Sequence, residues 1–234
     1  YYRIFTGMIV IPLVLVLVLS LVILGMQYRE QAIENIRGVQ KGVAAELQSD
    51  VDFMSMRLSQ LINVNDNMVI QYAVAMNEAD QDARYDAQKK LDQAGNMVIE
   101  PVKDVVSIGF YMKNGNAFFL KSSIKRTIEE TRAKQWYQDA LQNLNSVKIG
   151  SYQTRKASDL YLGGSRDQLV LIYALSPNSM IDRSQSVEMV VLYQTSDAGN
   201  AIRNYNRNYI RGNNKLGIMQ IVGENGEAIY KTEE

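Results

Sequence analysis

The chain opens with an unbroken apolar segment. Residues 4 to 26 read IFTGMIVIPLVLVLVLSLVILGM, and none of these 23 residues is charged. A helix rises about 1.5 Å per residue, so this segment can cross a hydrocarbon core of roughly 30 Å. A cleaved secretory signal has a shorter apolar region that ends in small residues, whereas Gly25-Met26-Gln27-Tyr28 is a poor cleavage site. The pattern therefore predicts an uncleaved transmembrane helix within residues 1–28.

A second helical pattern follows directly. Its apolar residues recur every 3.5 residues on average, which is the spacing of a helix with one continuous apolar seam. The seam consists of Ile33, Ile36, Val39, Val43, Leu47, Val51, Met54, Leu58 and Leu61. It packs either on the globular part of its own chain or on the same helix of a second subunit, and the sequence favours neither. We expect a stalk helix that ends near Asn63, followed by accessory helices over about 68–76 and 80–96.

From Val105 the apolar residues follow a different period, which favours strands. An Asn-Gly turn at 113–116 lies between two β-rich runs and predicts a hairpin. The sequence Thr127-Ile128-Glu129-Glu130 fits a capping box, so a helix is predicted from there to about Leu144. Strands are then expected over 158–162, 168–175 and 187–193, and a helix from Ser196. Two strands, a helix and three strands predict an α+β fold, an antiparallel sheet with helices packed on it.

The last residues repeat the earlier hairpin pattern. LGIMQIV and EAIYKT flank a second Asn-Gly pair, 111 residues after the first. We therefore expect four parts: a cytoplasmic edge and membrane helix at 1–28, a stalk with accessory helices at 29–100, a globular module at 101–212, and the start of a second, similar module at 213–234. Because the chain begins with Tyr1 rather than Met, we expect it to be part of a longer protein.

Composition excludes several functions. Lys+Arg and Asp+Glu number 25 each without a basic stripe, so no nucleic-acid partner is expected. The chain has no Cys and no His, which excludes a zinc finger, an iron–sulfur cluster, a thiol nucleophile and a Ser/His/Asp triad. Asp80, Asp82 and Asp86 fall in a helical stretch without the glycine of a calcium loop. We expect no catalytic residue, no metal and no cofactor.

Four motifs carry a family resemblance. They are SIGFYMKNGNAFF (107–119), KQWYQDAL (134–141), VEMVVLYQTSDAGNAI (187–202) and IMQIVGENGEAIY (218–230). In this order they resemble the double Cache sensor domains of bacterial transmembrane receptors, most of all those of sensor histidine kinases. The resemblance implies a PAS-like module that lies outside the cytoplasm from about residue 29, senses a small ligand and signals as a homodimer.

The same architecture forms the sensor region of several kinds of receptor. The alternatives are a chemoreceptor, a diguanylate cyclase and a membrane-bound transcriptional regulator. The region itself is expected to be no enzyme, although the full-length protein would be a kinase on the first reading. Readings of another class are a membrane-tethered extracytoplasmic enzyme and a passive adhesion or scaffold module. Neither paired carboxylates at strand ends nor another catalytic pattern supports the enzyme.

The resemblance also implies where a ligand binds. Amino-acid-binding members carry Arg-x-Trp-Tyr, a later Tyr, and an Asp at the end of the last strand. Trp136 and Tyr137 match, and Tyr152 matches the later Tyr, but Arg132 precedes Trp136 by four residues rather than two. Tyr193-Gln194 stands where the Asp would be. An amino group then has no carboxylate partner, so we expect a small polar organic ligand, sugar-like or an organic acid rather than an amino acid.

The predicted pocket lies between the sheet and the helix over 129–144. Aromatic rings with a few hydroxyls and one cation suit a small polar molecule. Its predicted lining is Tyr111, Arg132, Trp136, Tyr137, Tyr152 and Tyr173. The alternative is that these aromatic side chains simply fill the core, as the single tryptophan, Trp136, often does.

The seam generates a test of dimerisation. Cysteine placed singly at Val43, Leu47 or Val51 is expected to form a disulfide between subunits in membranes, because a heptad seam suits contact with a second helix. The chain has no native cysteine that would interfere. Non-reducing electrophoresis measures the crosslink. If no seam position crosslinks, the seam belongs to the subunit's own module.

Overall fold

The computed structural model describes residues 2–63, 68–76, 80–99, 104–121, 128–146, 150–160, 168–176, 187–211, 218–222 and 228–230. The chain divides into two units, residues 1–45 and residues 46–234. One helix, α1 (Tyr2–Asn63), supplies the whole described part of the first unit and the first element of the second.

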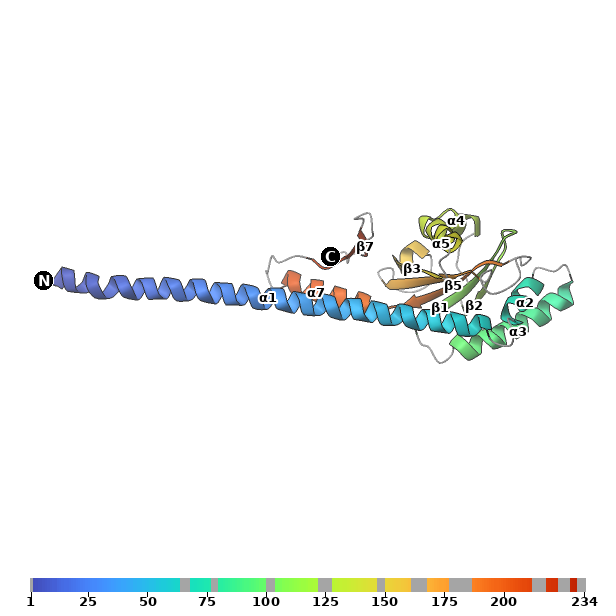
Figure 1. Cartoon of the computed structure of the whole chain (residues 1–234), viewed down its shortest axis with the longest axis horizontal. Helices are drawn as coiled ribbons and strands as arrows, with labels where there is room; N and C mark the ends of the chain where they lie inside the picture. Colours follow the sequence, from blue (N-terminus) through green and yellow to red (C-terminus); the bar gives the residue numbers. More distant parts are fainter. Residues whose placement is uncertain are drawn as a thin grey trace. The chain divides into compact units, whose positions relative to one another are not determined.

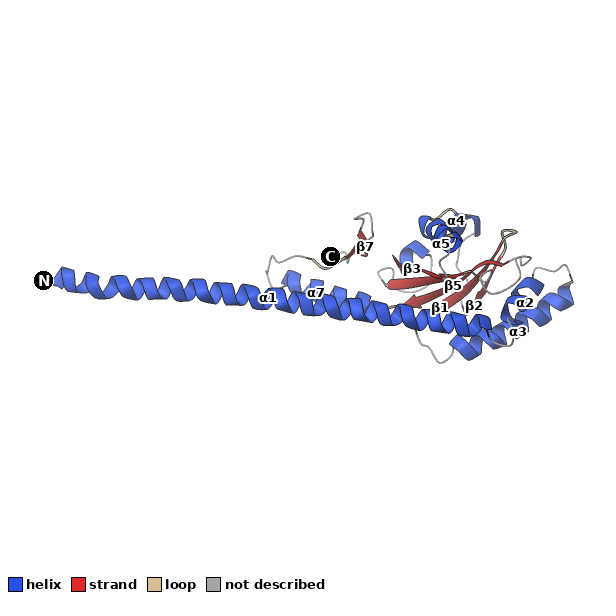
Figure 2. Ribbon diagram, in the orientation of Figure 1, coloured by secondary structure: helices blue, strands red, loops and turns tan. Residues whose placement is uncertain are grey.

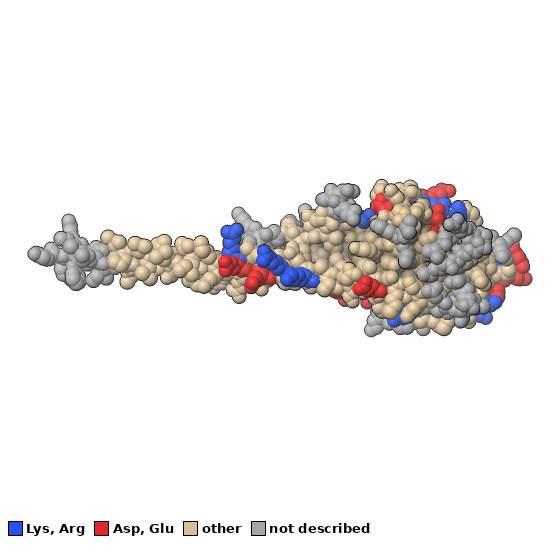
Figure 3. All heavy atoms as spheres, in the orientation of Figure 1, with Lys and Arg blue, Asp and Glu red and all other residues tan. Residues whose placement is uncertain are grey.

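The first part of α1 has the properties of a membrane span. An 18-residue window of this helix reaches a mean hydropathy of 2.7, and none of that window is buried. In Figure 3 the part of this helix drawn in tan shows neither blue nor red atoms until the first charged side chains beyond the apolar segment. Pro12 lies inside the helix, where it removes one backbone hydrogen bond. The predicted helix, long and apolar enough to cross a membrane, is therefore present.

The second unit is built on an antiparallel sheet of five strands, in the order β2-β1-β5-β4-β3 (Figure 2). The strands are β1 (Val105–Met112), β2 (Ala117–Leu120), β3 (Gly150–Lys156), β4 (Leu169–Leu175) and β5 (Val187–Thr195). The β1–β2 hairpin turns at Gly115, whose φ of 97° favours glycine. The last strand, β5, pairs with both β1 and β4 and so joins the two halves of the sheet.

Helices cover both faces of this sheet (Figure 1). One face carries the end of α1 with α2 (Met68–Ala75) and α3 (Gln81–Ile99), and the other carries α4 (Ile128–Arg132), α5 (Gln135–Asn145) and α6 (Ala157–Leu160). Successive strand residues enter opposite cores, as Phe110 and Tyr111 do. Strands β1, β4 and β5 are buried on both faces, which explains why they read as continuous apolar runs.

The C-terminal elements dock on the same unit. Helix α7 (Ala198–Arg211) follows β5, and a short hairpin pairs β6 (Ile221–Val222) with β7 (Ala228–Tyr230). The buried amide of Asn206 donates to the Met219 carbonyl and accepts from the Met219 N–H, both at 2.8 Å. The Tyr230 hydroxyl donates to the Gly199 carbonyl at 3.3 Å. The hairpin that the second Asn-Gly pair predicts is therefore present, although it is shorter than expected.

Two predicted elements are corrected. The single helix expected over 127–144 is two helices, because the backbone at Lys134 is extended between them (φ −73°, ψ 140°). Thr127, the cap of the predicted helix, lies outside the described residues. The strand expected over 158–162 is absent from its described part, which begins in helix α6. The strand is β3 instead, and because it is a partly exposed edge strand its sequence GSYQTRK lacks an apolar pattern.

The structure shows what one part of the α1 seam packs against. Met54, Leu58 and Leu61 are fully buried in the core beneath the sheet, and Leu47 and Val51 pack partly against the same cluster. From Leu47 onward the seam therefore packs on its own chain. A cysteine at Leu47 or Val51 would face this module, so the crosslinking prediction is corrected for these two positions. Dimerisation itself stays a prediction.

Gly150 generates a stability prediction. A Cβ at this position would overlap the hydroxyl oxygen of Tyr173 and lie 2.6 Å from its Cζ. Gly150→Ala is therefore expected to destabilise the protein by about 1–3 kcal/mol, because the buried Tyr173 ring has to move. Chemical unfolding of the detergent-solubilised chain measures the change.

A matched glycine provides the control. A Cβ at Gly38, on helix α1, meets no atom within 4 Å, so Gly38→Ala is expected to be neutral or to stabilise by up to about 1 kcal/mol through helix propensity. An equal effect of the two substitutions would contradict the steric argument.

Candidate ligand-binding site

Aromatic side chains fill the space between α5 and the sheet. Tyr137 packs edge-to-face against Tyr111 with ring centroids 5.1 Å apart, and Trp136 packs against Tyr193 at 6.0 Å. The four side chains are each at most 3% exposed. The predicted pocket interior is thus occupied by its own lining, and Trp136 fills the core as the alternative reading proposed. An accessible site has to lie at the rim of this cluster.

The cluster contains a buried pair of hydroxyls. Those of Tyr111 on β1 and Tyr193 on β5 lie 2.7 Å apart and form a hydrogen bond. Burial raises the pKa of both phenols well above the ordinary value, so both stay protonated. Because each hydroxyl is the other's partner, the pair stabilises the join between the two strands without a charge.

A polar group lies at the rim of the aromatic cluster. Arg132, the last residue of α4, donates from Nη2 to Glu188 Oε2 at 2.7 Å and to the Met112 carbonyl at 2.5 Å. The Tyr137 hydroxyl donates to the same Glu188 oxygen at 2.6 Å. The Arg132 and Glu188 side chains are 27% and 22% exposed. We call Arg132, Tyr137 and Glu188 the rim triad; solvent reaches its two charged members.

A β-bulge positions Glu188. Tyr111 pairs with Met189 while the next residue, Met112, pairs with Val187, so Glu188 is the extra residue on β5. A bulge turns a side chain away from the regular alternation of the strand. Here it aims a carboxylate from a buried strand toward α4 and α5, where it also contributes to raising the pKa of Tyr137, after burial.

The rim triad leaves hydrogen-bonding capacity unused. The Nε atom of Arg132 is buried and has no hydrogen-bond partner among the described residues. Arg132 and Tyr137 both use Oε2 of Glu188, and no described residue donates to Oε1. A ligand with an acceptor for the guanidinium and a donor for the carboxylate would satisfy both groups, which is the type of arrangement that fixes a small polar molecule.

Two predicted lining residues lie on the opposite face. Tyr152 on β3 pairs with Tyr173 on β4, so the two share a face of the sheet. That face is the α1 side, because Tyr173 belongs to the core there and its hydroxyl lies 3.0 Å from Ser55 Oγ on α1. Tyr152 is 62% exposed. The predicted placement of both tyrosines beside the 129–144 helix is therefore corrected, since the register of β3 puts them elsewhere.

Sequence reasoning missed three residues of this region. Gln153, and not Tyr152, faces α5, and it donates to the Trp136 carbonyl at 2.9 Å. Tyr193 entered the sequence argument only because Tyr193-Gln194 stands where amino-acid-binding members of the family carry Asp. Glu188 had a readable signal, because it is the single charge within the apolar run VEMVVLY. A charge in a buried strand needs a partner, and Arg132 is that partner.

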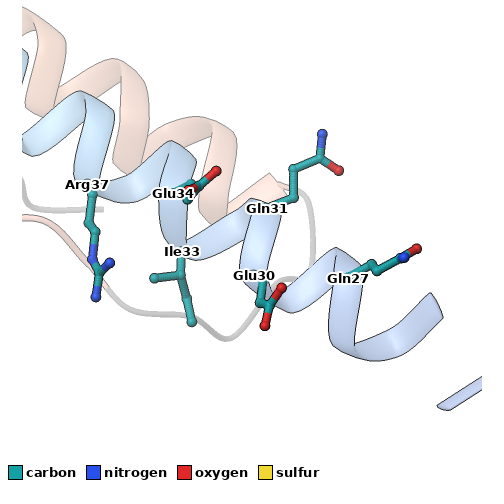
Figure 4. Close-up of a pocket in the computed structure, with 6 residues that line it drawn as sticks. All are labelled: Gln27, Glu30, Gln31, Ile33, Glu34 and Arg37. Carbon is teal, nitrogen blue, oxygen red and sulfur yellow. The ribbon is translucent and has the colours of Figure 1, made fainter. Parts of the chain in front are cut away.

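A surface hollow in the first unit is not a comparable site (Figure 4). Its lining is Gln27, Glu30, Gln31, Ile33, Glu34 and Arg37. All six residues come from one stretch of α1, and in Figure 4 their side chains point away from the helix in several directions. One face of a single helix does not enclose a ligand, so we assign no function to this hollow.

Comparison with known proteins gives distant structural similarity only. No family model matches the chain, and no curated protein matches it. Among solved structures, the chain is similar to the ligand-binding domain of the amino-acid chemoreceptor PctC of Pseudomonas aeruginosa in complex with GABA. The identity is 12%, the TM-score is 0.37, and 82% of this chain and 74% of that chain are covered.

A second solved structure is similar to the same degree. It is the ligand-binding domain of the chemoreceptor CtaA of Pseudomonas fluorescens in complex with L-isoleucine, at 12% identity and a TM-score of 0.33, with 83% of this chain and 70% of that chain covered. The ligands of these two domains contradict our expectation that a sugar-like ligand or an organic acid is favoured over an amino acid. That ranking is withdrawn.

The hydroxyl pair generates a double-mutant prediction. Tyr111→Phe or Tyr193→Phe alone is expected to cost about 1–3 kcal/mol of unfolding free energy, because the remaining buried hydroxyl loses its partner. The double variant is expected to lose less unfolding free energy than the two single variants lose in sum, because it leaves no buried hydroxyl without a partner. Denaturant unfolding of all four proteins measures the coupling. Strictly additive effects would show that the pair contributes no interaction energy.

Proposed function

We propose that this chain is the membrane-anchored, extracytoplasmic ligand-sensing region of a bacterial receptor. The observation that carries the proposal is the composition of α1. One uninterrupted helix contains both the apolar segment and Met54, Leu58 and Leu61 of the module's core. A change in the packing of the module on this helix therefore acts on the element that includes the membrane span.

The rim triad is the proposed ligand contact. Its charged side chains are partly exposed, it lies against the aromatic cluster, and no described residue donates to Glu188 Oε1. The buried Nε of Arg132 also has no partner among the described residues, so the guanidinium retains hydrogen-bonding capacity. The ligand we propose is a small organic molecule that carries both an acceptor and a donor. The sequence placed Arg132 in the predicted lining, although its spacing to Trp136 departs from the family pattern. In this proposal Glu188 supplies the carboxylate that is missing at Tyr193-Gln194.

The remaining parts of the proposal rest on the sequence. The resemblance to double Cache sensors favours a sensor histidine kinase as the full-length protein, with a chemoreceptor as the alternative. The region itself is proposed to be non-catalytic and to act as a homodimer, with residues from about 29 onward outside the cytoplasm.

A ligand screen with matched variants tests the proposed site. The full chain in nanodiscs is screened by thermal shift against amino acids, GABA, organic acids and sugars. For a ligand found in this way, Arg132→Gln and Glu188→Gln are expected to weaken binding by about 10–100-fold, because each leaves a charge without its partner. Isothermal titration calorimetry measures the affinities.

Tyr152→Phe is the control, because Tyr152 is exposed on the opposite face of the sheet. This variant is expected to bind within about threefold of the parent. If the folded Glu188→Gln and Arg132→Gln proteins bind as tightly as the parent, the site lies elsewhere. If no compound of the panel raises the melting temperature, the sensing function itself is contradicted.

A further inference from the structure

The end of β5 is connected to α1 by a partly buried carboxylate, that of Asp50. Ser196 Oγ donates to Asp50 Oδ2 at 2.6 Å, and Gln194 Nε2 donates to Asp50 Oδ1 at 3.4 Å. Ser196 also accepts the Ala198 N–H at 3.3 Å, which is a hydrogen bond at the first turn of α7. Asp50 therefore connects helix α1 to Gln194 near the end of β5 and to Ser196, which precedes α7.

Two of the three side chains at this junction are buried, and one of their polar atoms has no partner among the described residues. Gln194 is 3% exposed and Ser196 is 4% exposed. The Oε1 atom of Gln194 is buried and has no hydrogen-bond partner among the described residues. An unpartnered acceptor inside a protein is costly, so the junction lacks one donor while Asp50 is ionised.

The charges around Asp50 have the same sign. Glu46 lies one turn earlier on α1, Asp104 lies just before β1, and Asp197 lies just before α7. Burial is the largest cause that raises the pKa of Asp50, the Ser196 hydrogen bond lowers it, and Asp104 and Asp197 raise it further. Burial, Asp50 and Asp197 raise the pKa of Glu46 in the same way. The net effect disfavours the ionised form of Asp50 in the folded protein.

We propose that Asp50 is a proton-operated latch between α1 and the β5–α7 junction, which holds when the carboxyl group is protonated and loosens when it is ionised. A proton from water adds to Oδ1 and converts it from an acceptor into a donor. Oδ2 still accepts the Ser196 hydroxyl. The Gln194 amide turns its oxygen toward Oδ1 and accepts the new O–H, in exchange for the 3.4 Å contact from its Nε2, which is broken. The repulsion from Glu46, Asp104 and Asp197 is relieved.

The direction of the pH dependence follows from linkage. A carboxyl group whose pKa is higher in the folded state than in the unfolded chain stabilises the folded contact fully below its ordinary pKa of 3.8, and this stabilisation is lost as the pH rises through the raised value. Each unit by which the pKa is raised corresponds to about a tenfold change in the equilibrium between the closed and the open contact of Asp50 with the β5–α7 junction. The latch thus tightens toward acid and loosens toward neutral pH.

Hydrogen exchange on the full chain in nanodiscs tests the latch without any ligand. Protection of the first turn of α7, corrected for the intrinsic effect of pH on exchange, is expected to fall as the pH is raised from about 4 to about 8, by about tenfold per unit of raised pKa. Asp50→Asn keeps an acceptor for Ser196 and supplies a donor without a charge. It is expected to hold high protection across the range.

Two further variants make the result decisive. Asp52→Asn removes a carboxylate from an exposed position of the same helix, where Asp52 accepts from Gln48, and it is expected to keep the parent's pH dependence. Glu46→Gln leaves the Asp50 contacts intact but removes one repelling charge, so it should move the midpoint to lower pH. An Asp50→Asn protein with the parent's pH dependence, or a midpoint unmoved by Glu46→Gln, overturns the latch.

The signalling meaning of the latch rests on the proposed function, but its test does not. The exchange experiment reports only on the contact between α1 and the junction. A ligand screen without hits would therefore leave the latch standing, and a pH-independent contact would leave the rim triad standing.

Discussion

Three central strands that bury apolar side chains on both faces determine the architecture of the second unit. β1, β4 and β5 have almost no exposed residue, so the sheet requires a helical layer on each side. The end of α1 with α2 and α3 provides one layer, and α4, α5 and α6 provide the other. Removing either layer would expose a continuous apolar surface to water. The position of every polar group discussed above follows from this arrangement.

The two layers serve different purposes. On the α1 side the core is mainly aliphatic, although it includes Phe110 and Tyr173. Its polar contacts, Ser55 with Tyr173 and Asp50 with Ser196, connect the helix to β4 and to the residue that follows β5. On the α5 side the core is aromatic, and its polar contacts lie at the rim, where solvent reaches them. The proposed ligand contact and the contacts to α1 thus lie on opposite faces of one sheet. Strand β5 contributes Glu188 to the first and Gln194 to the second, and Ser196 follows directly after the strand.

Strand β5 links these faces through its irregular ends. Near its start a bulge turns Glu188 out of the regular alternation, and at its end the chain leaves the sheet at Ser196 to begin α7. Between them, Val190 and Val191 alternate between the two cores, and Tyr193 is fully buried in the α5-side core. A close-packed strand transmits displacement rather than absorbing it. If a ligand binds at the proposed site and moves Glu188, it acts on a strand whose other end contacts α1 through Gln194.

The sequence by itself determined the elements whose pattern is strong. The apolar segment and the seam gave α1, the Asn-Gly turn gave the first hairpin, and the apolar runs gave β4 and β5, because burial on both faces demands continuous apolar residues. It also predicted that Trp136 and Tyr137 lie between the sheet and the helix after the first hairpin, where both are buried. Tertiary structure alone decided the rest. A half-exposed edge strand such as β3 has no clear alternation of apolar and polar residues from which it could be predicted. A shift of one residue in its register also moves Tyr152 to the other face of the sheet. The ion pair of Arg132 with Glu188 and the contact of Asp50 with Ser196 join residues 56 and 146 positions apart, and only the folded chain brings such residues together.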